Sequence, residues 1–325
     1  MDSNLERASR EVSRKLQDGS AISLPPNVAL SNRGIEGLQV VEYELDAQMT
    51  DSRLTLVLGL DPLDFRDAAF SILRDGTYEP VFSDMFMRLA SVSNHAYDIG
   101  ANIGYYSLLA LKCNPEITVT SFEPNPMLWE RFKVNADLNG VSKRARLEQV
   151  GVGEEASETT LYVPSTTGTG GGSLRDLHPL EGTRAQPTVR IVNPTTLDIS
   201  QTPDLIKMDI EGAELSAIRG LLPLIRQGLP TIFVELLRKW MKPFNSHPMD
   251  VVLLLLELGY EMFAIGEAQI SSVETIDNNT KETNFLFVHP TRDSHHRLVR
   301  DAARPLRHEN FHRHQSLPGS IALST

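Results

Sequence analysis

The stretch Ala96–Gly104 reads Ala-Tyr-Asp-Ile-Gly-Ala-Asn-Ile-Gly, an apolar run that ends in an acid and two spaced glycines. A helical pattern begins directly after it, at Tyr105. Strand, glycine turn and helix in this order are typical of an α/β sheet that presents a loop to a ligand. The spacing Gly-x-x-x-Gly differs from the Gly-x-Gly-x-x-Gly pattern that binds a dinucleotide pyrophosphate. Asp98 is better placed for a cation than for an anion, so we expect a ligand with an ammonium group and no phosphate.

Strand and helix patterns alternate outward from this stretch. We expect strands at residues 95–99, 117–122, 145–150, 205–208, 231–236, 260–265 and 284–288. We expect the intervening helices at residues 105–111, 126–138, 211–222 and 250–258. This alternation predicts an α/β fold with a doubly wound, mostly parallel sheet, because each parallel strand returns through a right-handed helical crossover. The last two strands can run antiparallel, and the sheet is expected to be seven-stranded.

Composition and pattern divide the chain into four parts. These parts are an N-terminal polar extension at 1–36, a small cap at 37–93, the main domain at 94–290 and a disordered basic tail at 291–325. The cap is expected to hold a strand pair at 41–45 and 53–59. The tail is rich in arginine and histidine and has no apolar periodicity, which favours disorder over a metal site.

A β-hairpin is expected as an insertion in the main domain, with strands at 159–164 and 188–193. Its glycine-rich loop Thr166–Ser173 precedes no helix and lacks the Lys-Ser/Thr end of a P-loop. We interpret it as a mobile loop, and a lid over the site is the functional option.

Charge and apolar patterning exclude several functions. The net charge of −11 argues against a nucleic-acid partner. The longest apolar run, Val251–Leu256, is too short to span a bilayer, and the N-terminus has no apolar signal segment, so we expect no membrane association and a cytoplasmic protein. The single cysteine, Cys113, cannot form an internal disulfide, and no Cys/His set has zinc spacing.

Ligands of a doubly wound sheet lie beyond the carboxyl ends of its strands. Asp98 and Gly100 end the first strand, and Glu123 ends the second, about 20 residues after the glycine turn, where a carboxylate accepts hydrogen bonds from ribose hydroxyls. Gly151 and Val152 follow the third strand and are placed beside an adenine ring by topology alone. S-adenosylmethionine combines ribose, adenine and an ammonium group without phosphate, so it is the expected cofactor.

A second dense motif reads Leu-Ile-Lys-Met-Asp-Ile-Glu-Gly-Ala-Glu at residues 205–214. Lys207 and Asp209 share a strand face, which Glu211 continues if the strand extends that far. Glu211 and Glu214 are three residues apart at a predicted helix start and would share a helix side. Acids in a first turn complement the helix dipole, but four ionisable groups within eight residues exceed that need. We therefore expect a functional role for Asp209 or Glu211.

Four segments together resemble the FkbM family of S-adenosylmethionine-dependent methyltransferases. They are Tyr-Asp-Ile-Gly-Ala-Asn-Ile-Gly at 97–104, Phe-Glu-Pro-Asn at 122–125, the motif at 204–214 and Phe-Val-Glu at 233–235. The resemblance covers residues 75–290 and implies a class I methyltransferase fold that methylates hydroxyl groups on natural products, including polyketides and sugars. The residues to which we assign cofactor binding are Asp98, Gly100, Asn102, Gly104, Glu123, Pro124, Gly151 and Val152.

Transfer of a methyl group to a neutral alcohol requires removal of the hydroxyl proton by a base. Asp209 and Glu211 are the first candidates, provided that partial burial raises their basicity. His247 is the second, because its pKa suits the task. Glu235 ends the next strand and could face the same cleft. We expect no metal, because no Asp-Asn pair follows the fifth strand as it does in catechol-type methyltransferases.

The expected reaction is O-methylation of a small-molecule acceptor, and two alternatives stay open. An N-methyltransferase would keep the same cofactor site and need less base catalysis, because a neutral amine attacks directly. A nicotinamide-dependent dehydrogenase would share the topology, but the absent Gly-x-Gly-x-x-Gly pattern counts against it.

Overall fold

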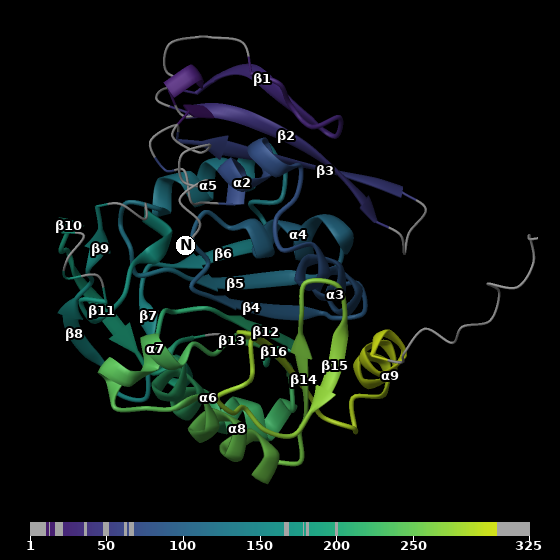
Figure 1. The fold of residues 1–325 in the computed structure, drawn as a ribbon, viewed down its shortest axis with the longest axis vertical. Helices are drawn as coiled ribbons and strands as arrows, with labels where there is room; N and C mark the ends of the chain where they lie inside the picture. Colours follow the sequence, from purple (N-terminus) through teal and green to yellow (C-terminus); the bar gives the residue numbers. More distant parts are fainter. Residues whose placement is uncertain are drawn as a thin grey trace, which may run out of the picture.

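The computed structural model describes residues 11–12, 14–16, 22–35, 38–47, 52–61, 64, 68–165, 169–177, 179, 182–198 and 201–303. A central sheet of eight strands organises them, in the order β15-β14-β16-β13-β12-β4-β5-β6 (Figure 1). Its strands are β4 (His95–Ile99), β5 (Thr118–Phe122), β6 (Ala145–Glu148), β12 (Leu205–Met208), β13 (Thr231–Glu235), β14 (Glu261–Ile265), β15 (Ile270–Val273) and β16 (Asn284–Val288).

Pairing within the sheet confirms the doubly wound, mostly parallel expectation. β4 pairs in parallel with β5 and β12, β5 with β6, and β12 with β13. β16 runs antiparallel between β13 and β14. The expected count of seven strands is wrong by one, because β15 pairs antiparallel with β14 at the edge of the sheet. β15 reads Ile-Ser-Ser-Val and lies where we expected no strand. Its four residues pair with Met262–Ile265 of β14, so backbone hydrogen bonding to an existing edge places it in the sheet.

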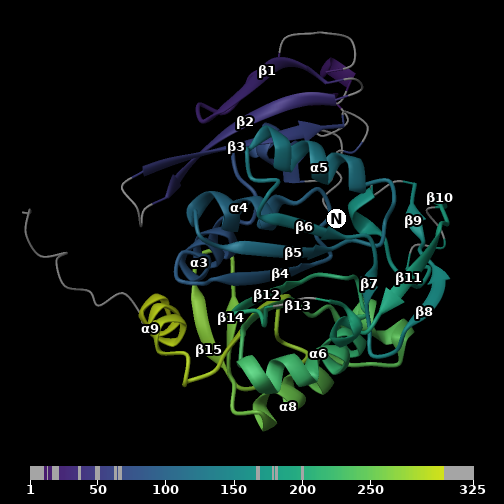
Figure 2. The same ribbon diagram turned by 180° about the vertical axis from the view of Figure 1, so that it is seen from behind.

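Helices cover both faces of the sheet (Figure 1 and Figure 2). The helices α3 (Pro80–Ala90), α4 (Tyr105–Cys113) and α5 (Trp129–Leu138) lie on the face toward the cap, and α6 (Glu214–Gly228) and α8 (Pro248–Glu257) lie on the other. Alternate residues of each strand serve the two faces, as the period of a strand requires. In β13, Phe233 joins the core on the α3 side, while Ile232 and Val234 join the core beneath α6 and α8.

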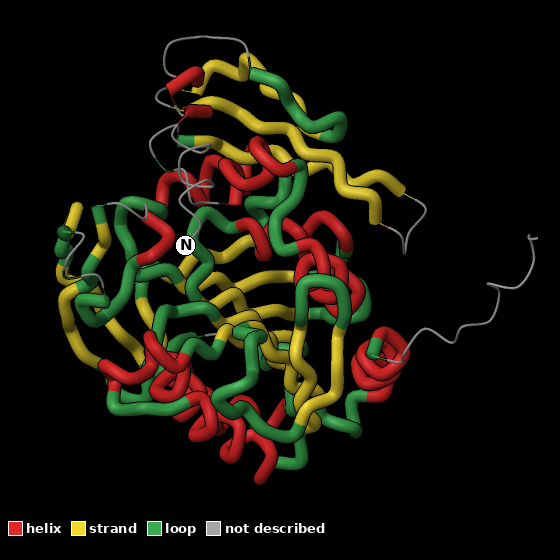
Figure 3. Tube along the Cα trace, viewed as in Figure 1, coloured by secondary structure: helices red, strands yellow, loops and turns green. Residues whose placement is uncertain are grey.

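The cap consists of a three-stranded antiparallel sheet, β1 (Val28–Ile35), β2 (Leu38–Ala47) and β3 (Ser52–Leu60), followed by α2 (Ala68–Asp75) (Figure 3). The expected strand pair therefore gains β1, which falls in the region predicted to be a polar extension. Asn135 of α5 and Asn139, the residue that caps the C-terminal end of α5, connect this sheet to the main domain. Their side-chain oxygens accept hydrogen bonds from Gly59 N at 2.6 Å and Val57 N at 3.0 Å.

The expected β-hairpin insertion is present between β6 and β12. β8 (Ser157–Thr160) pairs antiparallel with β11 (Thr188–Val192), which also pairs in parallel with β7 (Gly151–Val152). Further elements of the insertion are β9 (Val163–Pro164), η1 (Thr169–Gly171), β10 (Thr183–Ala185) and η2 (Pro194–Thr196). Figure 1 shows this insertion as a separate group of strands beside β6 and α7 (Arg238–Met241), which η3 (Lys242–Phe244) follows.

The C-terminal expectation needs a correction. Residues Asp293–Ala302 form helix α9, so the region predicted as a disordered tail begins with an ordered helix. His295 is 1% exposed, and its Nδ1 and Nε2 atoms lie 2.7 Å from Thr231 Oγ1 and 3.1 Å from Ser93 Oγ. The rest of the predicted tail, 304–325, lies outside the described residues. Among the described helices, none has the length and apolarity needed to cross a membrane.

Candidate active site

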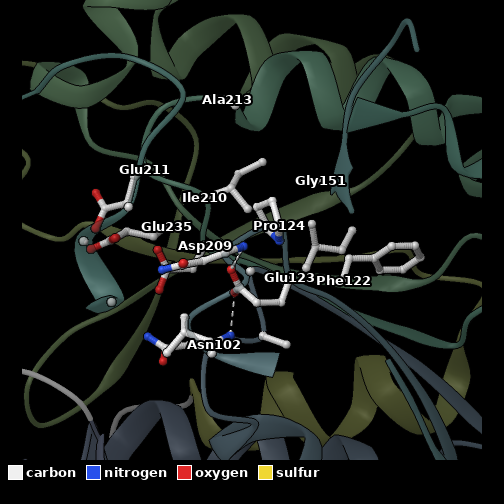
Figure 4. A pocket seen from close by; sticks show the side chains of 18 of the residues that line it. Asn102, Phe122, Glu123, Pro124, Gly151, Asp209, Ile210, Glu211, Ala213 and Glu235 are labelled. Atoms are coloured by element: carbon white, nitrogen blue, oxygen red, sulfur yellow. Dashed lines mark hydrogen bonds between the residues drawn. The ribbon is translucent and has the colours of Figure 1, made fainter. Parts of the chain in front are cut away.

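A cavity of about 360 Å³ lies at the carboxyl ends of β4, β5, β12 and β13, within the size range of ligand pockets. Figure 4 shows it from close by. The predicted site residues that line it are Gly100, Asn102, Glu123, Pro124, Gly151, Val152, Asp209 and Glu211. Three predicted residues are absent from the lining, namely Asp98, Gly104 and His247.

Glu123 anchors one end of the cavity. It follows the last residue of β5 and is 6% exposed. Its Oε2 accepts a hydrogen bond from Asn102 N, and its Oε1 accepts one from Asn125 N, both at 2.8 Å (Figure 4). Burial raises the pKa of Glu123 to about 7, although the two backbone N–H groups favour its charged form. The carboxyl group is therefore held in one orientation at the glycine turn.

Gly100 and Gly104 bend the chain after β4, with φ angles of 78° and 89°. A Cβ at Gly100 would lie 1.9 Å from the carbonyl oxygen of Asp209, so only glycine fits where the two strand ends meet. A Cβ at Gly104 would lie 2.8 Å from the ring of Phe132. Gly104 therefore serves helix packing, and its predicted contact with the cofactor has no support from the lining of the cavity.

Asp98 is buried beneath the cavity rather than exposed in it. Its Oδ2 accepts hydrogen bonds from Ser107 N at 3.0 Å and Ser107 Oγ at 2.6 Å. Its Oδ1 lies 3.8 Å from Nζ of Lys207, which also donates to the carbonyl of Gly100 at 3.2 Å. Asp98 thus forms an internal ion pair with Lys207. Its expected role as the counter-charge of a ligand ammonium has no support from this geometry and stays a prediction.

Three carboxyl groups gather at the other end of the cavity. Oxygen atoms of Asp209, Glu211 and Glu235 all lie within 4.8 Å of one another, which confirms that Glu235 faces the same cleft. The carboxyl groups of Glu211 and Glu235 point toward each other in Figure 4. Burial and then the charge of Asp209 raise the pKa of Glu211 to about 8 and that of Glu235 to about 10. The cluster therefore retains protons at neutral pH.

Glu211 reaches the cluster through its backbone conformation. Its φ of 53° places it in a left-handed turn, and α6 begins only at Glu214. The expected helix from residue 211 starts later, and the expected sharing of one helix side by these two glutamates is wrong. Glu214 is 2% exposed, and its Oε1 accepts a hydrogen bond from Gly212 N at 2.9 Å. Of the two, only Glu211 lines the cavity.

The cap contributes three lining residues that the sequence reasoning missed, Ala68, Tyr78 and Glu79. Glu79 has a left-handed backbone, with φ of 43° and ψ of 61°, directly before α3. Its Oε2 accepts a hydrogen bond from the hydroxyl of Tyr106 at 2.5 Å. Burial raises the pKa of Glu79. The available signal was the Tyr-Glu-Pro sequence, because proline at the first helical position marks a helix start at the end of a loop.

His247 caps a helix. Its Nδ1 accepts a hydrogen bond from Met249 N at 3.1 Å, and its own N–H donates to Asp250 Oδ2 at 2.7 Å, which completes a capping box at the start of α8. Since this imidazole is bound to backbone and absent from the lining, its predicted role as a base has no support from the geometry.

The donor set of the cavity fits a nucleoside-type cofactor at the Glu123 end. An oriented carboxyl group accepts hydroxyl hydrogen bonds, glycines let a ligand approach the backbone, and Leu161, Leu174 and Ile191 supply an apolar wall. At the opposite end, Asp209, Glu211 and Glu235 are the single set of metal-ligand-type side chains close enough together to hold an ion, among the residues that the structure describes. Acids this close also occur without a metal, and the expectation of no metal stays a prediction.

The proteins reported in the comparisons are all methyltransferases. The family model described as "Methyltransferase FkbM domain" matches residues 98–262. "Methyltransferase 1" of Beauveria bassiana (strain ARSEF 2860) is 26% identical in an alignment of 164 residues, gaps included, that covers 44% of this chain and 66% of that protein. "Methyltransferase sdnD" of Sordaria araneosa is 25% identical in an alignment of 186 residues that covers 44% of this chain and 67% of that protein. The chain thus spans about two thirds of the length of these two relatives.

A third relative and two solved structures extend the comparison. "31-O-demethyl-FK506 methyltransferase FkbM" of Streptomyces tacrolimicus is 36% identical over 72 residues, which are 22% of this chain and 27% of that protein. The crystal structure of methyltransferase FkbM from Methylobacillus flagellatus KT has a TM-score of 0.41 at 18% identity, covering 60% of this chain and 43% of that one. The structure of a putative caffeoyl-CoA O-methyltransferase from Staphylococcus aureus has a TM-score of 0.38 at 14% identity, covering 64% and 81%. Structural similarity at this level supports no conclusion about the activity of this chain.

The family model carries the assignment. It spans just over half of the 325 residues and contains the glycine turn, Glu123 and the carboxyl cluster. The cofactor that this family implies is S-adenosylmethionine, and membership sets the dehydrogenase alternative aside. The chain belongs to the FkbM family of methyltransferases.

Proposed function

We propose that the protein is a methyltransferase that moves a methyl group from S-adenosylmethionine to a hydroxyl group of a small molecule, such as a natural product or a sugar. The observation that carries this proposal is one cavity with two chemically different ends. A single oriented carboxyl group lies at the Glu123 end, and three clustered carboxyl groups lie at the Asp209 end. The first suits a nucleoside, and the second suits proton transfer from an acceptor.

The Glu123 end is the proposed cofactor end. Glu123 would accept hydrogen bonds from ribose hydroxyls, because backbone N–H groups already orient its two oxygens. Pro124, Gly151 and Val152 line the same end and would contact the adenine ring of the cofactor. A Cβ at Gly151 would lie 2.6 Å from Ile191 Cδ1, so a larger residue there would have to displace the end of the Ile191 side chain. S-adenosylmethionine, when bound, supplies a methyl group that is already electrophilic, which leaves orientation and proton removal to the protein.

Asp209 is the proposed base. Glu211 and Glu235 have raised pKa values of about 8 and about 10, so at pH 7 both keep their protons. Asp209 has a cationic partner, because its Oδ2 lies 3.7 Å from Nζ of Lys207. Its carboxylate would accept the hydroxyl proton of the acceptor. The two protonated glutamates would hold that hydroxyl in place by hydrogen bonds.

The experiment compares Asp209→Asn with wild type and with Glu130→Gln, an acid on α5 whose side chain is 83% exposed. Calorimetry measures binding of S-adenosylhomocysteine, and mass spectrometry follows transfer of a labelled methyl group into a metabolite extract. We expect Asp209→Asn to bind within about threefold of wild type and to lose about 10²- to 10⁴-fold in turnover, which is the typical contribution of a general base. Normal turnover by Asp209→Asn would contradict the assignment.

N-methylation of an amine is a second candidate, and the same carboxyl cluster favours it. An acidic end attracts a protonated amine, which would transfer its proton to Asp209 before it attacks. The two candidates differ in the atom that carries the methyl group. Fragmentation of the labelled product therefore distinguishes an O-methyl ether from an N-methyl amine.

A further inference from the structure

The glycine-rich turn Thr169–Gly172 forms part of the cavity wall. All four of its residues line the cavity beside the cofactor end. A Cβ at Gly170 would lie 2.8 Å from the side-chain nitrogen of Asn102, so the turn packs directly against the glycine turn that follows β4. Asn102 in turn donates its backbone N–H to Glu123. The position of this wall therefore affects the residues that orient the carboxyl group of the cofactor end.

A buried carboxyl group outside the cavity holds this turn. Asp64 is 0% exposed and is absent from the cavity lining. Its Oδ1 accepts a hydrogen bond from Thr169 N at 3.2 Å, and its Oδ2 accepts one from Thr169 Oγ1. Asn125 adds a third contact, because its Nδ2 donates to the carbonyl of Thr169 at 3.3 Å. Thr169 is consequently bound through its N–H, its hydroxyl and its carbonyl.

The charge of Asp64 is balanced by an arginine that reaches the cap. Arg131 of α5 donates from Nη1 to Asp64 Oδ2 at 3.2 Å, and the two side chains are 8% and 0% exposed. Its Nε and Nη2 donate to the carbonyl of Gly59 in β3 at 3.3 Å and 3.1 Å. A buried ion pair requires good geometry and further hydrogen bonds to offset desolvation, and both are present here. Asp64 thus links the cap, α5 and the cavity wall.

We propose that Asp64 is a positioning residue for the cofactor, which acts by fixing the turn Thr169–Gly172 against Asn102. A wall that is ordered before binding lowers the entropy lost on binding, so the ion pair would raise cofactor affinity without touching the cofactor. This inference rests on the assignment of the Glu123 end to S-adenosylmethionine. It gives a function to the glycine-rich loop and to a residue of the cap that lies outside the segment matched by the family model.

The test uses Asp64→Asn and Thr169→Val in the full-length protein. Asp64→Asn replaces the carboxylate with a neutral amide of similar size. Thr169→Val removes only the hydroxyl donor and leaves the ion pair between Asp64 and Arg131 in place. Asn139→Ala is the matched control. It loses hydrogen bonds of 3.0 Å and 2.6 Å to Val57, so it weakens the same contact between cap and α5 without touching the turn.

Three quantities are measured, namely the Kd of S-adenosylhomocysteine by calorimetry, amide hydrogen exchange of the turn in the cofactor-free protein, and the melting temperature. We expect Asp64→Asn to raise the Kd about tenfold, as for loss of one charge-assisted hydrogen bond, and Thr169→Val to raise it about threefold. Exchange of the Thr169–Gly172 amides should accelerate in both variants. The double variant should bind about as weakly as Asp64→Asn, because both changes break the same contact.

The control separates positioning from loss of stability. Asn139→Ala should lower the melting temperature but leave both the Kd and the exchange of the turn unchanged. The proposal is overturned if Asp64→Asn binds S-adenosylhomocysteine like wild type, or if Asn139→Ala weakens binding as much at an equal loss of melting temperature. Failure of the wild-type protein to bind S-adenosylhomocysteine overturns the cofactor assignment together with this proposal. Normal wild-type binding with unchanged affinity in Asp64→Asn overturns this proposal alone.

Discussion

Replacement of Gly100 by alanine should damage the site more than its size suggests. Gly100 has a φ of 78°, which costs an L-residue about 1–2 kcal/mol. The added methyl group would also lie 1.9 Å from the carbonyl oxygen of Asp209, so the two strand ends must separate by about 1.5 Å to reach van der Waals contact. Overpacking of this kind costs a further 1–3 kcal/mol, roughly. We expect Gly100→Ala to lower the free energy of unfolding by about 2–5 kcal/mol.

Gly140→Ala provides the matched control. Gly140 also has a positive φ, 69°, but a Cβ there meets nothing within 4 Å. Gly140→Ala should therefore lower the free energy of unfolding only by the cost of a positive φ for an L-residue, about 1–2 kcal/mol. Urea unfolding measures both losses, and calorimetry measures the Kd of S-adenosylhomocysteine. Because Gly100 N donates to Phe122 O at 2.9 Å, a displaced turn disturbs Asn102 and Glu123, and we expect a Kd raised more than about tenfold in Gly100→Ala alone. Equal losses in the two variants, with unchanged binding, would refute the reasoning.

Three further outcomes are expected. Burial lowers the pKa of His295 to about 4, so the folded protein keeps its imidazole neutral while the unfolded chain protonates it below about pH 6.5. The free energy of unfolding should therefore fall by up to about 3 kcal/mol from pH 6.5 to pH 4. Urea titrations at several pH values measure this dependence, and His295→Gln should weaken it. Lys207→Met leaves Asp98 buried without its cationic partner, and we expect it to lower the free energy of unfolding in urea by about 3–5 kcal/mol. The Lys207→Met/Asp98→Asn double variant should recover part of this stability. No recovery would show that the two side chains do not stabilise each other. Treatment with EDTA should leave methyl transfer within about twofold of the untreated enzyme, since a base accounts for the proton; a loss that Mg²⁺ or Mn²⁺ restores would instead assign Asp209, Glu211 and Glu235 to a metal.

The proposed cofactor end could be predicted because it is built from strand ends. Gly100 directly follows β4, Glu123 directly follows β5, and Gly151 begins β7. The parallel sheet brings these positions to one edge. The same rule located Asp209 and Glu235, which follow or end β12 and β13. Sequence order was sufficient for these residues, since each lies within a residue or two of a predicted strand end.

Asp98 shows where that rule fails. Position at a strand end did not reveal which way the side chain points or what it meets. β12 lies next to β4 with Lys207 paired opposite Asp98, so the ion pair becomes visible only when the strand order and register are known. Gly104 is similar, because its constraint comes from the ring of Phe132 on the following helix.

Contributions from the cap were missed for a different reason. Tyr78, Glu79 and Asp64 act through contacts with Tyr105, Tyr106, Thr169 and Arg131, which lie far along the chain. No periodicity or spacing encodes such contacts. Helix α9 was missed because its apolar stripe is short. Of its residues only His295 and Val299 are buried, one turn apart, and the first of these is polar.

The central claim is that S-adenosylmethionine binds at the Glu123 end of the cavity, with the acceptor at the Asp209 end. A crystal structure of the complex with S-adenosylhomocysteine tests it most directly. We predict that the ribose hydroxyls of the ligand lie within hydrogen-bond distance of the Glu123 carboxyl group and that its sulfur faces the side of the cavity formed by Asp209. A ligand bound elsewhere, or a Glu123 carboxyl group bonded only to Asn102 and Asn125 in the complex, would contradict the account.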